Sequence, residues 1–102
     1  MNQYKLTEEA QRELADLTHH IAKEASLERA LIVYDHFVAA FERLAGMPGI
    51  GHVRENLLNP DYRFWSVYSY LIVYRWETVP IQIVAIVHGM RNLEFFFSQR
   101  PM

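Results

Sequence analysis

Cysteine is absent from this chain of 102 residues, which excludes a disulfide framework and any zinc site built on cysteine. The five histidines are scattered except for the adjacent His19 and His20, so the sequence predicts no metal site and no cofactor. No apolar run approaches the roughly eighteen residues that a membrane-spanning helix needs. The N-terminus lacks the basic start and apolar stretch of a signal peptide, so we expect a cytoplasmic protein.

Lysine is missing from the chain after Lys23, and the formal net charge is −2. Residues 1–45 carry more acidic than basic side chains. Residues 46–102 are weakly basic, and their strongly basic side chains are all arginines. A protein that binds nucleic acid through its phosphates usually carries a dense field of lysine and arginine. The charge pattern therefore disfavours a surface built to lie against nucleic acid.

What the chain does contain is apolar. Hydrophobic residues make up 51% of it, including six Phe, six Tyr and two Trp, which is ample for a compact core and too apolar for a disordered segment. The length suits a single small domain over residues 1–102.

The first half predicts a short strand and two helices. Residues 3–6 alternate as a strand would, and Thr7 and Ser26 each suit a helix N-cap. Apolar spacing places one helix up to about residues 23–24 and a second from 27 to about 45. Because the break is about two residues, the helices should form an antiparallel hairpin. The expected apolar stripe of the second helix is Leu27, Leu31, Tyr34, Val38, Phe41 and Leu44, flanked by Ala30, Phe37 and Ala45.

The second half predicts strands. Glycine and proline in residues 46–51 end the second helix, and the loop of about sixteen residues that leads to Tyr62 is of a length that is often functional. Three strands follow, at residues 62–67, 70–76 and 81–88, joined by short turns into an antiparallel meander. We expect one shared core that includes Leu14, Leu17, Tyr34, Phe41, Ile72 and Val84.

The sequence therefore predicts an α+β fold with the order β-α-α-β-β-β. In it a helical hairpin packs on one face of an antiparallel sheet, and the other face is left free for a partner or substrate.

Three stretches of this chain resemble the RelE/ParE superfamily of bacterial toxins. The first is the end of one helix at Ile21-Ala22 with the end of the next at residues 41–45, and the second is the helix exit Leu44-Ala-Gly-Met-Pro-Gly-Ile-Gly51. The third is the strand Tyr70-Leu-Ile-Val-Tyr-Arg75 with the closing Val87-His-Gly-Met-Arg-Asn-Leu93. The resemblance covers nearly the whole chain and implies the toxin of a type II toxin–antitoxin system, of the kind that stabilises plasmids.

The superfamily has two branches with different targets. RelE-like toxins cleave mRNA on the ribosome, which requires groups that stabilise the scissile phosphate and move protons. If this chain were such an endoribonuclease, the resemblance would make Arg63, Arg75, His88 and Arg91 its catalytic residues. A purely structural alternative is that the arginines at positions 63 and 75 form ion pairs with Asp61 or Glu77. In that alternative His88 orders the end of its strand.

We favour the ParE branch, whose members poison DNA gyrase. The sequence after Arg91 reads Asn-Leu-Glu-Phe-Phe-Phe, apolar and acidic, where the RelE branch supplies basic catalytic groups. The resemblance implies a cognate antitoxin, and the partner-binding residues we expect are Phe95, Phe96 and Phe97, because all three cannot face inward. A homodimer and a diverged, inactive member that only binds a protein partner remain alternatives.

Overall fold

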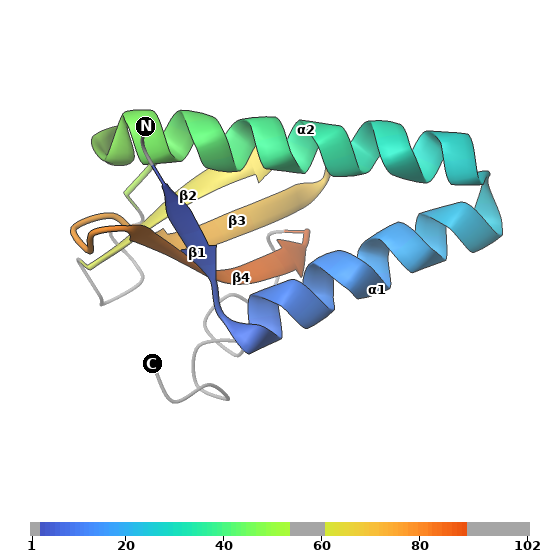
Figure 1. Ribbon diagram of the computed structural model, residues 1–102, viewed down its shortest axis with the longest axis horizontal. Coiled ribbons are helices and arrows are strands. Elements are labelled where there is room, and N and C mark those ends of the chain that lie inside the picture. The colour runs from blue at the N-terminus through green and yellow to red at the C-terminus, as the bar shows by residue number, and fades with distance from the viewer. Residues whose placement is uncertain (1–2, 54–60, 90–102) are drawn as a thin grey trace.

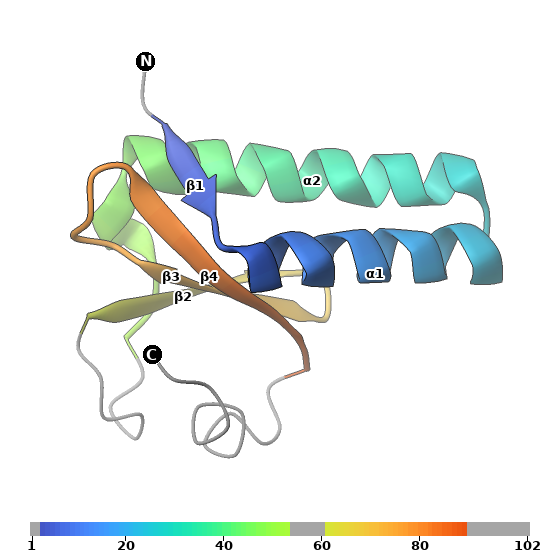
Figure 2. The same ribbon diagram turned by 60° about the horizontal axis from the view of Figure 1, so that its bottom comes forward.

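The computed structural model describes residues 3–53 and 61–89. Its elements, in order, are β1 (Tyr4–Leu6), α1 (Glu8–Glu24), α2 (Leu27–Gly46), the 3-10 turn η1 (Pro48–Ile50), β2 (Tyr62–Val67), β3 (Tyr70–Arg75) and β4 (Ile81–His88) (Figure 1). Both helices lie on the same face of the sheet (Figure 2). The predicted α+β class, element order and helical hairpin are confirmed.

Each helix begins at the N-cap that the sequence predicts. The Thr7 hydroxyl accepts a hydrogen bond from the Ala10 amide at 3.1 Å, and the Ser26 hydroxyl accepts one from the Arg29 amide at 3.0 Å. Each cap satisfies one of the amide groups that the first turn of a helix leaves unpaired. The glutamates in the first turn of each helix stabilise it, because their negative charge lies at the positive end of the helix dipole.

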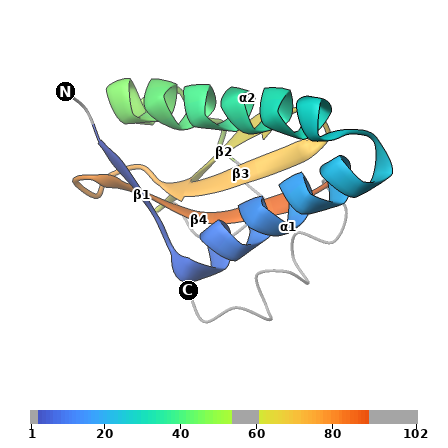
Figure 3. The ribbon, with the colours of Figure 1, turned by 45° about the vertical axis from the view of Figure 1, so that its right-hand side comes forward.

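The sheet has four strands in the order β1-β4-β3-β2. The meander β2-β3-β4 is antiparallel as predicted, whereas β1 joins β4 in parallel, with Tyr4 opposite Ile81 and Leu6 opposite Ile83. The sheet is therefore mixed, and β1 and β2 form its two edges. In space, α1 lies beside β4 and α2 lies over β3 and β2 (Figure 3).

The start of α1 covers the edge of β4 beyond the end of the short strand β1. The Thr7 amide donates to the Ile83 carbonyl at 3.0 Å, and its hydroxyl donates to the Val84 carbonyl at 3.3 Å. Nearly two helical turns later, the Glu13 carboxylate accepts a hydrogen bond from the Ile86 amide at 3.0 Å. In the same region, the pairing of β3 with β4 shifts its register between Val73 and Tyr74. Thr7, the N-cap of α1, and the side chain of Glu13 thus satisfy backbone groups that a longer β1 would have paired.

The buried face of α2 differs from the predicted apolar stripe. Leu27, Leu31 and Tyr34 are 66%, 56% and 42% exposed, and the buried face is shifted towards the residues expected to flank the stripe. It consists of Ala30, Val33, Phe37, Ala40, Phe41, Leu44 and Ala45. The tip of the helical hairpin extends past the end of the sheet (Figure 1), so the first turns of α2 have less of the sheet to pack against than its later turns do. The expectation that Tyr34 lies in the core is therefore wrong, while Phe41 and Leu44 are buried as predicted.

The two faces of the sheet have separate apolar clusters. Leu14, Leu17, Phe41 and Ile72 share the cluster under the helices, as expected. Val84 belongs instead to the cluster on the opposite face, with Tyr62, Phe64, Leu71, Val73 and Ala85, all buried. The prediction that this second face is open is thus wrong, and the single shared core is wrong for Val84. Neither helix is long and apolar enough to cross a membrane in the described part of the chain.

Candidate functional site

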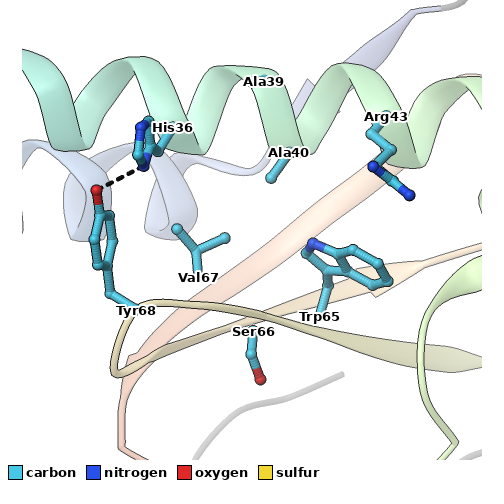
Figure 4. A pocket seen from close by; sticks show the side chains of 8 residues that line it. All are labelled: His36, Ala39, Ala40, Arg43, Trp65, Ser66, Val67 and Tyr68. Atoms are coloured by element: carbon cyan, nitrogen blue, oxygen red, sulfur yellow. Dashed lines mark hydrogen bonds between the residues drawn. The ribbon is translucent and has the colours of Figure 1, made fainter.

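A groove of about 510 Å³ lies between α2 and the edge strand β2 (Figure 4). From α2, the side chains of His36 and Arg43 point towards the strand, and from the strand Trp65 and Val67 point back towards the helix. The full lining is His36, Ala39, Ala40, Arg43, Trp65, Ser66, Val67 and Tyr68. Its walls therefore combine aromatic rings with basic side chains, a composition suited to binding a partner.

One end of the groove is closed by a contact between Tyr68 and His36. The Tyr68 hydroxyl lies 2.6 Å from His36 Nδ1, and the two rings are parallel within 4°. The Arg29 guanidinium lies 5.9 Å from the centroid of the same tyrosine ring. Tyr68 begins the two-residue turn between β2 and β3 with φ of 55°, a conformation that a bulky residue rarely adopts. Contacts with α2 hold the ring in place in spite of that backbone conformation.

At the other end, Trp65 forms a platform. The Arg43 guanidinium lies 5.7 Å from its ring centroid, and the His52 ring stacks on it at 5.9 Å and 12°. His52 is held by two backbone hydrogen bonds to Phe64, one in each direction, which extend the sheet by a single rung. Cation–π contacts of this kind fix the position of an arginine head without using up its hydrogen-bond donors.

The segment that precedes His52 is anchored by Tyr74. The tyrosine hydroxyl donates to the Pro48 carbonyl at 2.7 Å and accepts from the Gly51 amide at 2.9 Å. Burial raises the pKa of Tyr74, and the Gly51 hydrogen bond and the Arg63 charge oppose that rise more weakly. The anchor explains how η1 and His52 are fixed against the sheet.

Arg63, a sequence-predicted catalytic candidate, belongs to this same anchor. Its Nη1 donates to the carbonyls of Gly49 and Gly51 at 3.2 and 3.3 Å, and its guanidinium lies 4.4 Å from the Trp76 ring centroid. The side chain therefore holds the loop after α2, a role different from the carboxylate pairing considered for it.

The three described catalytic candidates do not converge. Arg75 pairs with Tyr62 across β2 and β3, on the sheet face away from the helices. Its guanidinium lies 5.8 Å from the centroid of the Tyr62 ring. His88 stacks on Tyr70 at 4.6 Å at the far end of β3, five residues from Arg75, or roughly 17 Å along a strand. Groups that share one proton-transfer centre must come within hydrogen-bond reach of the same atoms. The sheet brings Arg63 and Arg75 to the same end but on opposite faces, and leaves His88 apart.

The remaining predicted residues, Arg91 and the partner-binding Phe95, Phe96 and Phe97, lie outside the described residues. Within residues 3–53 and 61–89, no three His, Asp or Glu side chains gather in a way that could hold a metal ion. Sequence reasoning missed the groove residues His36, Arg43 and Trp65. The signal that could have found two of them is the recurrence of basic residues at positions 29, 36 and 43, one heptad apart on one helix face.

Comparison with known proteins supports the resemblance drawn from the sequence. The family described as ParE toxin of type II toxin–antitoxin system, parDE, matches residues 4–93. A solved structure titled as the chromosomal ParDE toxin–antitoxin system from P. aeruginosa superposes with a TM-score of 0.73 at 22% identity, covering 88% of this chain and 98% of that one. No curated protein matches the chain in sequence. Because the family match spans most of the chain, this protein belongs to the ParE toxin family of type II toxin–antitoxin systems.

Proposed function

We propose that this toxin acts by inhibiting DNA gyrase in the bacterial cytoplasm and is neutralised there by a cognate antitoxin. The observation that carries the choice of target is the separation of Arg63, Arg75 and His88. An mRNA endoribonuclease must stabilise a pentacoordinate phosphate and transfer protons at one point. Residues at opposite ends and faces of a sheet do not supply such a point.

Charge supports the same choice. The chain has a net charge of −2, and a ribosome-bound nuclease must lie against dense phosphate, where each lost basic contact lowers affinity. A gyrase inhibitor needs a protein surface of specific shape, and its affinity does not depend on attraction to phosphate. The mRNA endoribonuclease remains the second candidate, and a member without toxicity that only binds a protein partner remains the third.

Two assays with the purified chain separate these candidates. The first measures ATP-dependent supercoiling of relaxed plasmid by gyrase, and the second maps cuts in mRNA on programmed ribosomes. We expect inhibition of supercoiling, relieved by the antitoxin encoded in the neighbouring reading frame, and intact mRNA. Codon-phased cuts with undisturbed supercoiling would reverse the assignment, and inactivity in both assays would favour the non-toxic alternative.

A further inference from the structure

Helix α2 carries an apolar row of which only one half is covered. Residues of the row recur at spacings of four and three, and they are Leu27, Leu31, Tyr34, Val38, Phe41 and Ala45. In the half towards the end of the helix, Phe41 and Ala45 are buried, and the Phe41 ring lies 5.3 Å from that of Tyr4 in β1. In the half towards the turn of the hairpin, the first three residues of the row are exposed and Val38 is partly buried. These four residues are called the open row below.

Helix α1 sets small side chains beside the open row. Glu13 reaches the edge of β4 from one flank of α1. The helical repeat turns the other flank, with Ala15, Thr18 and Ala22, towards α2. The Thr18 hydroxyl donates to the Leu14 carbonyl of its own helix at 2.9 Å, so a partner can cover it without breaking that hydrogen bond. The outer side of the hairpin, away from the sheet, thus combines a row of large apolar side chains with a strip of small ones.

Exposed charged residues flank these apolar side chains on the outer side of the hairpin. On α2, Glu28 and Asp35 lie seven positions apart beside the open row. On α1, Asp16 and Lys23 lie seven positions apart beside the strip of small residues. In the part of the chain that the structure describes, none of these four side chains forms an ion pair. Their charges are therefore available to a partner that covers the outer side.

We propose that the outer sides of two copies of this chain pack together about a two-fold axis that runs parallel to the helices. In this arrangement α2 of each copy lies on α1 of the other, and the open row of each copy fills the strip of small residues on its partner. The same contact forms twice, so the assembly closes as a dimer. The inference concerns the free chain and goes beyond the proposed function.

The charges select this arrangement over the other two-fold packing. Glu28 follows the turn at residues 25–26 by as many positions as Lys23 precedes it, so each Glu28 comes opposite the partner's Lys23. By the same count Asp35 comes opposite the partner's Asp16, which is the unfavourable pair of this contact. A two-fold axis across the helices would instead set α2 on α2, with the acidic residues of both copies together, and like charges at an interface repel.

A second copy of the chain fits this surface better than an unrelated helix does. The open row needs small side chains opposite it and a cation opposite Glu28, and the outer side of α1 in this same chain offers both. Such self-complementarity is what a two-fold contact requires. The open row extends over about twelve residues, or about 18 Å of helix, so the interface is small. We expect a dissociation constant of about 10–100 μM, and unfolding measured at about 1 μM therefore reports the monomer.

The test is sedimentation equilibrium of the full chain between about 5 and 500 μM, where we expect a single monomer–dimer equilibrium. Leu31→Glu should weaken the dimer by about tenfold or more, because it places a carboxylate in the centre of the contact. Val79→Glu is the matched control, since it makes the same change of charge at a side chain that is 98% exposed. That residue belongs to the turn between β3 and β4, at the opposite end of the molecule from the hairpin turn (Figure 1), and its substitution should leave the dimer unchanged.

Charge reversal tests the arrangement of the two copies. Asp16→Lys should tighten the dimer by about threefold or more, because the new lysine comes opposite the partner's Asp35. In a packing of α2 on α2 the same substitution would gain nothing. Glu28→Lys should weaken the dimer by setting two lysines opposite each other, and adding Lys23→Glu in the same chain should restore it.

Three outcomes overturn the proposal: a chain that stays monomeric up to about 500 μM, a Leu31→Glu variant that associates like its control, or no gain from Asp16→Lys. Open-ended oligomers also overturn it, since the proposed contact closes. A monomeric chain whose open row is protected from solvent only by the antitoxin would overturn it and assign the row to that partner. None of these readouts involves gyrase, so the result stands apart from the supercoiling assay.

Discussion

The amide of Gly51 donates a hydrogen bond of 2.9 Å to the hydroxyl of Tyr74, in a contact that leaves no room for a side chain at position 51. A Cβ built on Gly51 would overlap the Tyr74 hydroxyl and come within 2.8 Å of Cε1 of the ring. The glycine therefore allows the chain after α2 to lie directly against β3. This close approach fixes η1. It thereby also fixes His52, whose backbone pairs with Phe64 of β2 beside the groove.

The first prediction compares two glycines of that segment. Gly51→Ala should lower the free energy of unfolding by about 1–3 kcal/mol, because the new methyl group must displace a buried tyrosine ring. Gly49→Ala is the matched control, since a Cβ there meets no atom within 4 Å. Urea unfolding of both variants measures the difference. Equal stabilities would show that Tyr74 moves aside without cost.

The second prediction concerns alkaline pH. Burial raises the pKa of Tyr74 above its ordinary value, so the folded state disfavours the tyrosinate. The contribution of this residue to stability is present below about pH 10, the pKa in the unfolded chain, and is lost as pH rises through the higher folded pKa. Tyr74→Phe should therefore cost about 1–3 kcal/mol at neutral pH and should flatten the decline at high pH.

The measurement is urea unfolding between about pH 8 and pH 11. Tyr4→Phe serves as a control. Burial raises the pKa of Tyr4 most, and the nearby Glu42 and Tyr34 raise it further. Unlike Tyr74, however, Tyr4 does not anchor the loop after α2. That variant should flatten the same decline with a smaller loss at neutral pH. An unchanged alkaline slope in Tyr74→Phe would contradict the pKa argument.

Features decided by neighbouring residues could be predicted from the sequence. The N-caps Thr7 and Ser26 and the glycine–proline exit after α2 act within one turn of the chain, and all three occur as expected. The meander was also predictable, because short turns leave adjacent strands little choice but to pair. The parallel pairing of β1 with β4 was not, because nothing local joins residues that lie more than seventy positions apart.

The error in the predicted buried face of α2 has a physical origin. The helix has apolar residues on more than one side, and periodicity alone does not say which side meets the sheet. The outcome depends on how far the hairpin tip extends past the strands (Figure 1), which is a tertiary property. In this fold Leu31 is exposed. The groove escaped prediction for a similar reason, since His36 and Tyr68 lie 32 positions apart and meet through the fold.

The third prediction tests the observed burial with one substitution at two positions of α2. Leu44→Ala should cost about 2–5 kcal/mol, because this side chain is 0% exposed and its removal leaves a cavity. Leu31→Ala should change stability by less than about 0.5 kcal/mol, because that side chain is 56% exposed. Thermal and urea unfolding report both. A large loss at Leu31 would indicate that the residue is covered in solution.

The fourth prediction concerns the support that α1 gives to β4. Glu13→Ala should destabilise the fold by about 1–3 kcal/mol, because the partly buried Ile86 amide loses its acceptor. Glu13→Gln keeps a side-chain carbonyl of the same reach and should lose less. Amide exchange at Ile86 should accelerate in the alanine variant ahead of global unfolding. Equal losses in both variants would assign the effect to charge.

The last prediction separates the two possible targets through His88. This residue is exposed and stacks on Tyr70 at the opposite end of β3 from Arg75, so its removal leaves the Tyr74 anchor intact. If the toxin inhibits gyrase through a protein surface, His88→Ala should inhibit supercoiling as the unaltered chain does and should arrest growth at the same level of inducer.

An endoribonuclease that used His88 as its general acid would lose about 10²–10⁴-fold in rate from the same change. Gly51→Ala is the companion variant, because it should lower toxicity only in proportion to the folded protein that remains. Soluble protein measured beside growth arrest distinguishes the two effects. A folded His88→Ala variant that no longer arrests growth would place His88 in the toxic mechanism and would return the mRNA endoribonuclease to first place.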